Sequence, residues 1–414
     1  MKLLLVGNHT CGNRGDSAIL RGLLSSLRSI NPELEIDSIT RYPVSSSFIL
    51  GEPLETDTLY HYHNKSSGRL DRLWKKYSKK VLPFMLYLSV LGLWKFKLPK
   101  HINLYLKKLN EYDAVVHVGG SFFVDLYGES QFEHALCSIL AKKPLYLIGH
   151  SVGPFQRKRF NIIAKLVFAK ANLVSLRESV SLELMQKDEM PTDKVHKGAD
   201  TAWLVDPTPI KISPQLLDYV NQKPTVAITL RELAPFDKRL GVTQDDYEKA
   251  FAVIVDNLIE TGYQVIACST CTGIDSYHKD DRMIALRVGN QLKSKEGYYV
   301  VMDELNDVEL GSLLSHCKLT IGTRLHSAII SMNFNTPAIA LNYEHKSEGI
   351  MNQLDLPLYS KPVKSLFDGT LNTAINVSLA NDDELSLIQP KIQAERERAH
   401  EMVKVMLTDV MKIK

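Results

Sequence analysis

The chain has 414 residues, which is enough for two or three domains that each bury a core of their own. Its hydrophobic fraction of 44% and charged fraction of 23% are those of an ordinary soluble globular protein. The net charge of +3 is too small to indicate a nucleic-acid-binding protein. The five cysteines are few, scattered and odd in number, which is typical of a reduced compartment. We therefore expect a cytoplasmic protein that binds no nucleic acid.

The first elements predict a βα unit. The apolar run Leu3–Val6 is too short for a secretory signal and is expected to form a buried strand. A glycine-rich turn follows, and the run Ile19–Leu27 has a helical pattern. The spacing of Gly7, Gly12 and Gly15 matches neither the dinucleotide fingerprint nor the P-loop. In this turn Asp16 either caps the helix or contacts a ligand.

Strand-like runs then alternate with helical patterns, which predicts a parallel sheet covered on both faces. The runs are 35–40, 114–118, 145–148 and 173–176. Ligands of open α/β sheets bind beyond the carboxyl ends of the strands. Polar residues that follow these strands are therefore candidate site residues, although each of them could instead serve as a cap or a surface ion pair: Asp125, His150 and Arg177.

Residues 65–108 interrupt this alternation. Twelve lysines and arginines in the segment are opposed by a single acid, Asp71, and they flank the apolar run Val81–Trp94. That run is shorter than the roughly 20 residues needed to cross a bilayer. Basic and aromatic residues around it favour an element that lies on an anionic membrane surface. A core helix with a solvated basic flank remains the alternative.

The second half repeats the alternation and predicts a second sheet. Its strands are expected at 224–230, 264–268, 298–302, 319–321 and 338–341, with a helix over 247–261 that ends at Gly262. Prolines between Trp203 and Pro214 mark the expected domain boundary. The last segment, about 382–413, is predicted to be one charged helix that packs back across both domains.

The turn at 318–332 carries the strongest ligand signal. A short strand meets Gly322, and Thr323 is a plausible N-cap that would place Arg324, Leu325 and His326 in the first helical turn. Helix N-termini attract anions, and a fixed cation strengthens that attraction. Arg231, which follows another strand of the same half, supplies a second guanidinium. Two arginines can clamp a ligand that carries both a carboxylate and a phosphate, such as phosphoenolpyruvate, and the histidine can exchange a proton with it.

Other chemistry has little support in the sequence. Cys268 and Cys271 form a lone CxxC without a second pair, so we expect no metal site. His61 and His63 resemble a surface pair with no third ligand. No motif of a zinc or serine hydrolase is present.

The chain resembles the polysaccharide pyruvyl transferases, particularly the enterobacterial members that act in colanic acid and amylovoran synthesis. Six sequence blocks carry the resemblance: 8–21, 118–125, 148–154, 228–235, 322–327 and 342–346. They occur in one order along nearly the whole chain, whereas the region 50–110 contributes little.

The resemblance implies two Rossmann-like domains in a glycosyltransferase-B-type arrangement with a cleft between them. The N-terminal domain, 1–207, would bind the acceptor, and the C-terminal domain, 208–381, would bind phosphoenolpyruvate; the helix 382–414 completes the chain. The Arg-Leu-His motif of the family falls on Arg324, Leu325 and His326. Its upstream donor arginine falls on Arg231, with Arg239 and Arg282 as alternatives. Four residues are expected on the acceptor side: Asn8, Asp16, Asp125 and His150.

In this interpretation His326 is the general acid and no cofactor is needed. The acceptor is a hexose of a lipid-linked oligosaccharide repeat unit, the product is a cyclic ketal, and the basic region 65–108 provides peripheral contact with the inner face of the plasma membrane. One alternative is a nucleotide-sugar-dependent glycosyltransferase of the same architecture. The other is a non-catalytic polysaccharide assembly protein.

Overall fold

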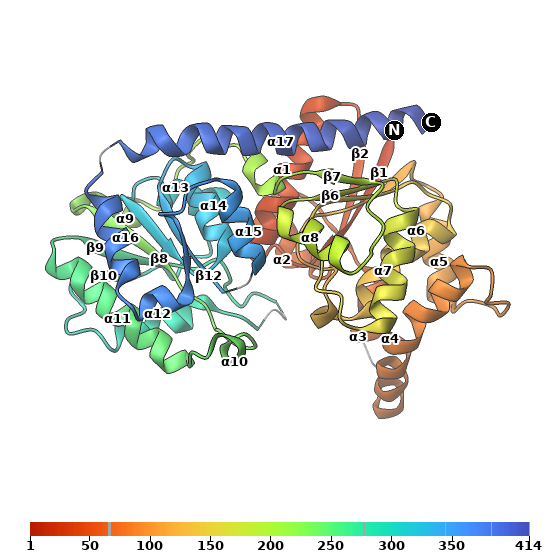
Figure 1. Cartoon of the computed structure of the whole chain (residues 1–414), viewed down its shortest axis with the longest axis horizontal. Helices are drawn as coiled ribbons and strands as arrows, with labels where there is room; N and C mark the ends of the chain where they lie inside the picture. The colour runs from red at the N-terminus through yellow and green to blue at the C-terminus, as the bar shows by residue number, and fades with distance from the viewer. Residues whose placement is uncertain (65–67, 276–277, 344, 382, 414) are drawn as a thin grey trace. The chain divides into compact units, whose positions relative to one another are not determined.

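A computed structural model describes residues 1–64, 68–275, 278–343, 345–381 and 383–413. The chain forms two compact units (Figure 1). Unit 1 consists of Met1–Thr10, Ile19–Leu204 and Glu397–Lys414, and unit 2 consists of Cys11–Ala18 and Val205–Arg396. Helices α1 (Arg14–Ile30) and α17 (Glu384–Ile413) each begin in unit 2 and end in unit 1.

Unit 1 is built on a parallel sheet that has seven strands in the described residues. Their order is β3-β2-β1-β4-β5-β6-β7. The strands are β1 (Lys2–Asn8), β2 (Glu35–Thr40), β3 (Glu55–Thr56), β4 (Ala114–His117), β5 (Leu145–His150), β6 (Leu173–Leu176) and β7 (Val195–Lys197). Strands β2 and β3 are added on one side of β1, and β4 to β7 are added on the other side. The position between β1 and β4, where the strand order reverses, is the switch point at which open α/β sheets bind ligands.

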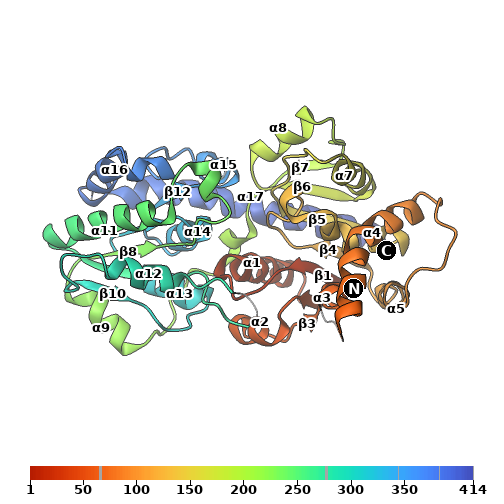
Figure 2. The same ribbon diagram turned by 90° about the horizontal axis from the view of Figure 1, so that it is seen from below.

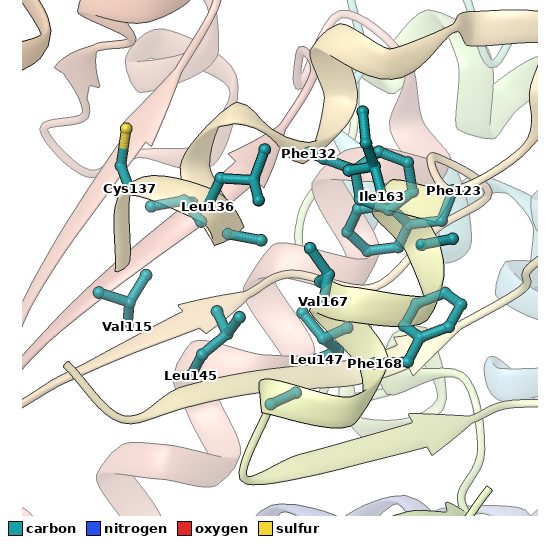
Figure 3. Packing of buried hydrophobic residues seen from close by; sticks show 14 of the residues in the cluster. Val115, Phe123, Phe132, Leu136, Cys137, Leu145, Leu147, Ile163, Val167 and Phe168 are labelled. Atoms are coloured by element: carbon teal, nitrogen blue, oxygen red, sulfur yellow. The ribbon is translucent and has the colours of Figure 1, made fainter. Parts of the chain in front are cut away.

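The helices of unit 1 cover this sheet. They are α2 (Pro43–Leu50), α3 (Thr58–Asn64), α4 (Arg69–Val90), α5 (Lys100–Leu109), α6 (Glu133–Leu140), α7 (Lys158–Lys170) and α8 (Ser179–Lys187), with 3-10 turns η1 (Asp125–Tyr127), η2 (Glu129–Phe132) and η3 (Thr201–Leu204). Their apolar faces close one core with the strands. In Figure 3, Phe123, Phe132 and Phe168 pack over Leu147 and Val167.

Unit 2 has the six-strand order of a classical dinucleotide-binding sheet in its described residues, β10-β9-β8-β11-β12-β13, and all recorded pairings are parallel. The strands are β8 (Thr225–Thr229), β9 (Gln264–Cys268), β10 (Tyr298–Val300), β11 (Leu319–Gly322), β12 (Ala338–Asn342) and β13 (Ser360–Pro362). Here the switch point lies between β8 and β11. The predicted class of two Rossmann-like α/β domains is thus confirmed.

The helices of unit 2 are α9 (Pro214–Gln222), α10 (Asp237–Leu240), α11 (Gln244–Glu260), α12 (Asp281–Gly289), α13 (Asp307–Leu314), α14 (Leu325–Asn333), α15 (His345–Gln353) and α16 (Thr370–Leu379), with the 3-10 turn η4 (Val363–Leu366). Figure 1 shows α11 and α12 on one side of the sheet and α13 and α14 on the other.

Two predicted helix caps are wrong by a few residues. Helix α1 begins at Arg14, so Asp16 lies inside its first turn and is not the N-cap. The N-cap of α14 is Arg324, whereas Thr323 precedes it and its hydroxyl is 2.7 Å from the hydroxyl of Tyr247. Arg324 has the extended backbone of an N-cap residue, with φ −93° and ψ 116°, so the helix begins one residue later than predicted.

The basic segment forms α4, α5 and the loop between them. Leu82, Met85 and Leu86 on the inner face of α4 belong to the core of unit 1, so the core-helix alternative holds for that face. The outer face is exposed, and Figures 1 and 2 show the α4–α5 loop extending away from the body of unit 1. Across the described residues, none of the helices combines the length and apolar character needed to cross a membrane. Residues 65–67 of this segment lie outside the described residues, as does Glu344 of the block 342–346.

Candidate active site

Two predicted arginines lie at the switch point of unit 2. Strands β8 and β11 are neighbours, with Thr229 paired to Gly322 at their carboxyl ends. Arg231 follows β8 by two residues and Arg324 follows β11 by two residues. The topology therefore brings together two cations that are 93 residues apart in sequence.

The start of α14 forms the floor of this site. Gly322 allows the strand-to-helix turn to close, because a Cβ at this position would lie 2.3 Å from Ser327 Oγ and 2.5 Å from Thr229 Oγ1. The Ser327 hydroxyl donates to the Arg324 carbonyl at 2.6 Å. The side chain of the N-cap residue makes no capping hydrogen bond. The positive end of the helix dipole thus acts at the loop that carries Arg324 and His326.

Arg231 is a buried cation, with 3% of its surface exposed. Its guanidinium carbon lies 3.9 Å from the ring centre of Tyr343 and 5.2 Å from that of Phe236, and its Nε donates to the Glu232 carbonyl at 3.0 Å. No carboxylate in the described part of the chain makes a recorded ion pair with it. Burying an uncompensated cation is costly, so this arrangement favours an anionic ligand that completes the site.

Arg324 is held in place by a buried acid. Its Nη2 donates to Asp281 Oδ1 at 2.7 Å, and the two side chains are 11% and 2% exposed. Asp281 is also fixed, because its Oδ2 accepts the Cys271 N–H at 3.1 Å. One edge of the Arg324 guanidinium is therefore anchored to the first residue of α12, which is itself tied to the loop after β9 through Cys271.

A third cation, Lys279, joins the two arginines and was not predicted. Its Nζ donates to the Ala234 carbonyl at 3.3 Å. Burial lowers the pKa of Lys279, and the charges of Arg231 and Arg324 lower it further, so the three groups share one electrostatic environment. An isolated lysine in a loop gives no sequence signal for this role.

The two alternative donor arginines are less suitable. Arg282 is fully engaged, with Nε and Nη2 on Asp280 at 2.9 and 2.7 Å and Nη1 on the Met302 carbonyl at 3.0 Å. Arg239 lies on the exposed surface of the short helix α10. The structure therefore favours Arg231, whose donor role stays a prediction.

His326 packs against a segment from the N-terminal part of the chain. Residues 11–18 belong to unit 2, where the fully buried Arg14 bonds Glu304, Leu305 and Thr272. The next residue, Gly15, is so close to His326 that an added Cβ would lie 2.4 Å from Nδ1 and 2.8 Å from Cβ of the histidine. The segment thus forms a wall for the imidazole and also contains Asp16.

The other three predicted acceptor residues, Asn8, Asp125 and His150, are buried in unit 1. His150 has no exposed surface, its Nε2 is 3.1 Å from the His117 carbonyl oxygen, and burial lowers its pKa to about 3. Asp125 accepts the Arg157 N–H at 3.0 Å and orders the loop that leads to α7; burial raises its pKa. Asn8 is the buried last residue of β1. His150 exposes no surface, and its acceptor role stays a prediction.

Cysteine and histidine positions also differ in part from expectation. All five cysteines are buried and unbridged. Among the residues that the structure describes, no group of three or more His, Cys, Asp or Glu side chains is arranged to hold a metal ion. His63, expected at the surface, has a side chain that is only 3% exposed and contacts Glu133. The sequence interpretation of His63 is therefore wrong.

Comparisons of the sequence with known proteins identify the family to which the chain belongs. Residues 13–345 match the family described as polysaccharide pyruvyl transferase. The amylovoran biosynthesis protein AmsJ of Erwinia amylovora is 54% identical over 392 residues, which cover 93% of this chain and 94% of that protein.

Solved structures share the architecture at low sequence identity. The UDP-GlcNAc 2-epimerase of Neisseria meningitidis, bound to UDP-GlcNAc, has a TM-score of 0.62 at 10% identity and covers 100% of both chains. The UDP-GlcNAc 2-epimerase of Methanocaldococcus jannaschii has a TM-score of 0.61 at 13% identity, covering 99% of this chain and all of the other. At such identities the likeness supports the fold alone.

Proposed function

Because the chain belongs to the polysaccharide pyruvyl transferase family, we propose that it transfers a pyruvyl group from phosphoenolpyruvate to a hexose of an exopolysaccharide repeat unit. The reaction forms a cyclic ketal and releases phosphate. The family and the relative in amylovoran biosynthesis support a transferase of exopolysaccharide synthesis. The donor and the ketal chemistry are our proposal.

The observation that carries the donor assignment is the unpaired charge of Arg231. A guanidinium that is 3% exposed, stacked on Tyr343 and without a recorded carboxylate partner in the described residues requires an anion for compensation. Arg324 and Lys279 add positive charge at the same switch point. Phosphoenolpyruvate carries a phosphate and a carboxylate on three carbons, which suits two or three cations better than a singly charged ligand would.

In the proposed mechanism the residues of unit 2 bind and activate the donor. Arg231, Arg324 and Lys279 hold its phosphate and carboxylate, and Leu325 forms part of the same turn. His326 protonates the methylene carbon, so that C2 becomes electrophilic and forms a bond to an acceptor hydroxyl oxygen. The C2–O bond to phosphate breaks, and a second hydroxyl closes the ketal. Of the two protons that the hydroxyls release, one returns to His326 and the other protonates the leaving phosphate. The cations stabilise negative charge on that phosphate.

The test is incubation of the protein with phosphoenolpyruvate and the lipid-linked repeat unit. We expect phosphate release that depends on the repeat unit, together with the mass of one added pyruvyl group. His326→Ala should lower turnover by about 10²–10⁴-fold with the fold retained. Transfer of a sugar from a nucleotide sugar, or full turnover by both His326→Ala and Arg324→Ala, would contradict the proposal.

We also propose that α4 holds unit 1 at an anionic membrane surface, where a lipid-linked acceptor resides. Leu73, Tyr77 and Val81 recur every four residues and are 50%, 69% and 53% exposed, so they form an apolar stripe on the outer face of α4. Lys76 and Lys80 lie beside that stripe and are exposed. An apolar stripe bordered by lysines is typical of helices that lie in the headgroup region.

Vesicle flotation tests this surface. Binding to phosphatidylglycerol vesicles is expected to exceed binding to phosphatidylcholine vesicles and to weaken with salt. The Tyr77→Ser, Val81→Ser double variant should lose binding, whereas Val253→Ser, at a residue 57% exposed on α11, is the matched control. Equal binding by the double variant and the control would refute the membrane role of α4.

A further inference from the structure

A polar cavity of about 50 Å3 lies inside unit 1, away from the residues assigned above. Gly7 of β1 and His117 of β4 line it, and their strands pair side by side, with Val6 opposite His117. The cavity is therefore at the switch point of the first sheet, the position at which this type of sheet binds ligands. We call it the histidine cavity.

Two histidine–carboxylate pairs form its walls. His134 Nε2 lies 3.0 Å from Asp57 Oδ2, and His63 Nε2 lies 3.1 Å from both oxygens of Glu133. These four side chains are between 3% and 10% exposed. The two pairs join residues that are 70 and 77 positions apart in sequence, so the cavity is formed by the fold and is not a surface irregularity.

One buried polar atom of the cavity has no partner. His63 directs Nε2 to Glu133, and its Nδ1 is buried without a hydrogen bond to the described residues. An unsatisfied buried polar atom costs about 1–3 kcal/mol. A hydroxyl group that reaches this atom from the cavity would satisfy it.

The lining indicates what kind of group fits. Arg41 and Lys79 contribute positive charge and Asp57 and Glu133 contribute negative charge, so the lining favours neither a lone anion nor a lone cation. The lining contains both hydrogen-bond donors and acceptors, as hydroxyl recognition requires. The volume holds about three or four water-sized groups, which matches the hydroxyl or hydroxymethyl substituents of a sugar and not its whole ring.

We infer that the histidine cavity binds hydroxyl groups of the acceptor carbohydrate, a role that rests on the proposed function only for the identity of that carbohydrate. The juxtaposition of a switch-point cavity, two buried histidine–carboxylate pairs and the unpartnered Nδ1 of His63 carries this inference. Asp57, His63 and Glu133 thus join the acceptor contacts expected from the sequence, and the acceptor roles of Asp125 and His150 stay predictions.

The first experiment measures binding in the absence of phosphoenolpyruvate. Saturation-transfer NMR is recorded on the full chain with methyl β-galactoside, methyl β-glucuronide and their disaccharide as probes. We expect saturation transfer to at least one probe, which Ser130→Leu abolishes by placing an apolar branched side chain at the cavity wall. Ser25→Leu, at an exposed serine of α1 in unit 1, is the matched control. No transfer to any probe, or equal transfer with both variants, would overturn the inference and leave a cavity that holds ordered water only.

The second experiment uses variants that alter the polar lining without filling it. His63→Gln and Gln131→Ala should raise the acceptor KM at least tenfold in the pyruvyl-transfer assay, with the KM for phosphoenolpyruvate within twofold of the wild type. Unchanged acceptor KM in an active enzyme contradicts the cavity assignment and leaves the proposed function standing. Sugar binding that the variants abolish in a protein with no phosphoenolpyruvate turnover supports the cavity and refutes the proposed function.

Discussion

The wall that Gly15 forms against His326 gives the sharpest test of the active site. Replacing Gly15 by alanine adds a single methyl group 2.4 Å from Nδ1 and 2.5 Å from Cγ of the imidazole. Carbon atoms in contact are normally about 3.5–4.0 Å apart, so the ring must retreat by about 1 Å. His326 cannot escape by rotating its ring alone, because its own Cβ is 2.8 Å from the added methyl.

The expected effect is on catalysis more than on stability. Gly15 lies in the first turn of α1 and does not have a positive φ, so alanine suits the backbone. Displacing a catalytic group by about 1 Å costs on the order of 100-fold in rate, equivalent to about 2.7 kcal/mol in the barrier. Overpacking of this kind lowers the free energy of unfolding by about 1–3 kcal/mol. We expect kcat to fall about 100-fold in a protein that remains folded.

The assay is phosphate release at saturating phosphoenolpyruvate, with urea unfolding as the measure of stability. Gly68→Ala is the matched control, because a Cβ there meets nothing within 4 Å. If Gly15→Ala retained kcat within twofold of the wild type, the position of His326 would not depend on this wall and the reasoning would be refuted. An equal fall in kcat for Gly68→Ala would show that the loss does not depend on contact with His326.

Three further outcomes follow from neighbouring groups. Asp281→Asn removes the buried charge that anchors Arg324; urea unfolding should show a loss of about 3 kcal/mol, and an unchanged midpoint would contradict the role of the pair. Lys279→Met should raise the KM for phosphoenolpyruvate about tenfold or more, as expected for one lost hydrogen bond to a charged group, and an unaltered KM would exclude Lys279 from the donor site. Burial lowers the pKa of His150 to about 3 in the folded state, below the value of about 6.5 in the unfolded state. Between these two values the unfolded state binds more protons, so the contribution of neutral His150 to stability is complete above pH 6.5 and is lost as the pH falls. The loss between pH 6.5 and 5 is about 2 kcal/mol. Thermal unfolding of His150→Gln should show a shallower loss over that range, and an identical slope would contradict this assignment.

The sequence predicted several inner strands well because strands with a neighbour on both sides are largely buried and rich in apolar residues. Glu35–Thr40, Leu173–Leu176 and Gln264–Cys268 have the predicted bounds. Three short edge strands of the described sheets, β3, β7 and β13, were missed because their two or three residues form no apolar run, whereas the equally short edge strand β10 has one and was predicted. Pairing of this kind is decided by the neighbouring strand and not by local preference.

The candidate site was predictable only in part. Arg231, Arg324 and His326 were found because they follow strands, and strand ends meet at one edge of a parallel sheet. The anchoring of Arg324 by Asp281 and the packing of Gly15 on His326 were not, because these contacts join residues 43 and 311 positions apart. No local pattern encodes a contact of that kind. The donor and acceptor roles of all these residues stay predictions.

The assignment of Cys11–Ala18 to unit 2 and Glu397–Lys414 to unit 1 also has a consequence for synthesis on the ribosome. Unit 2 needs a piece, Cys11–Ala18, that is made before most of unit 1, and unit 1 needs a piece, Glu397–Lys414, that is made after unit 2. Domains generally fold as units while the chain is made. Unit 1 therefore cannot reach its final form until Glu397 and the residues after it have been made, although most of its residues emerge before unit 2. Cutting the gene between the codons for Leu204 and Val205, where the chain passes from unit 1 to unit 2, would give two fragments that each lack part of their own domain.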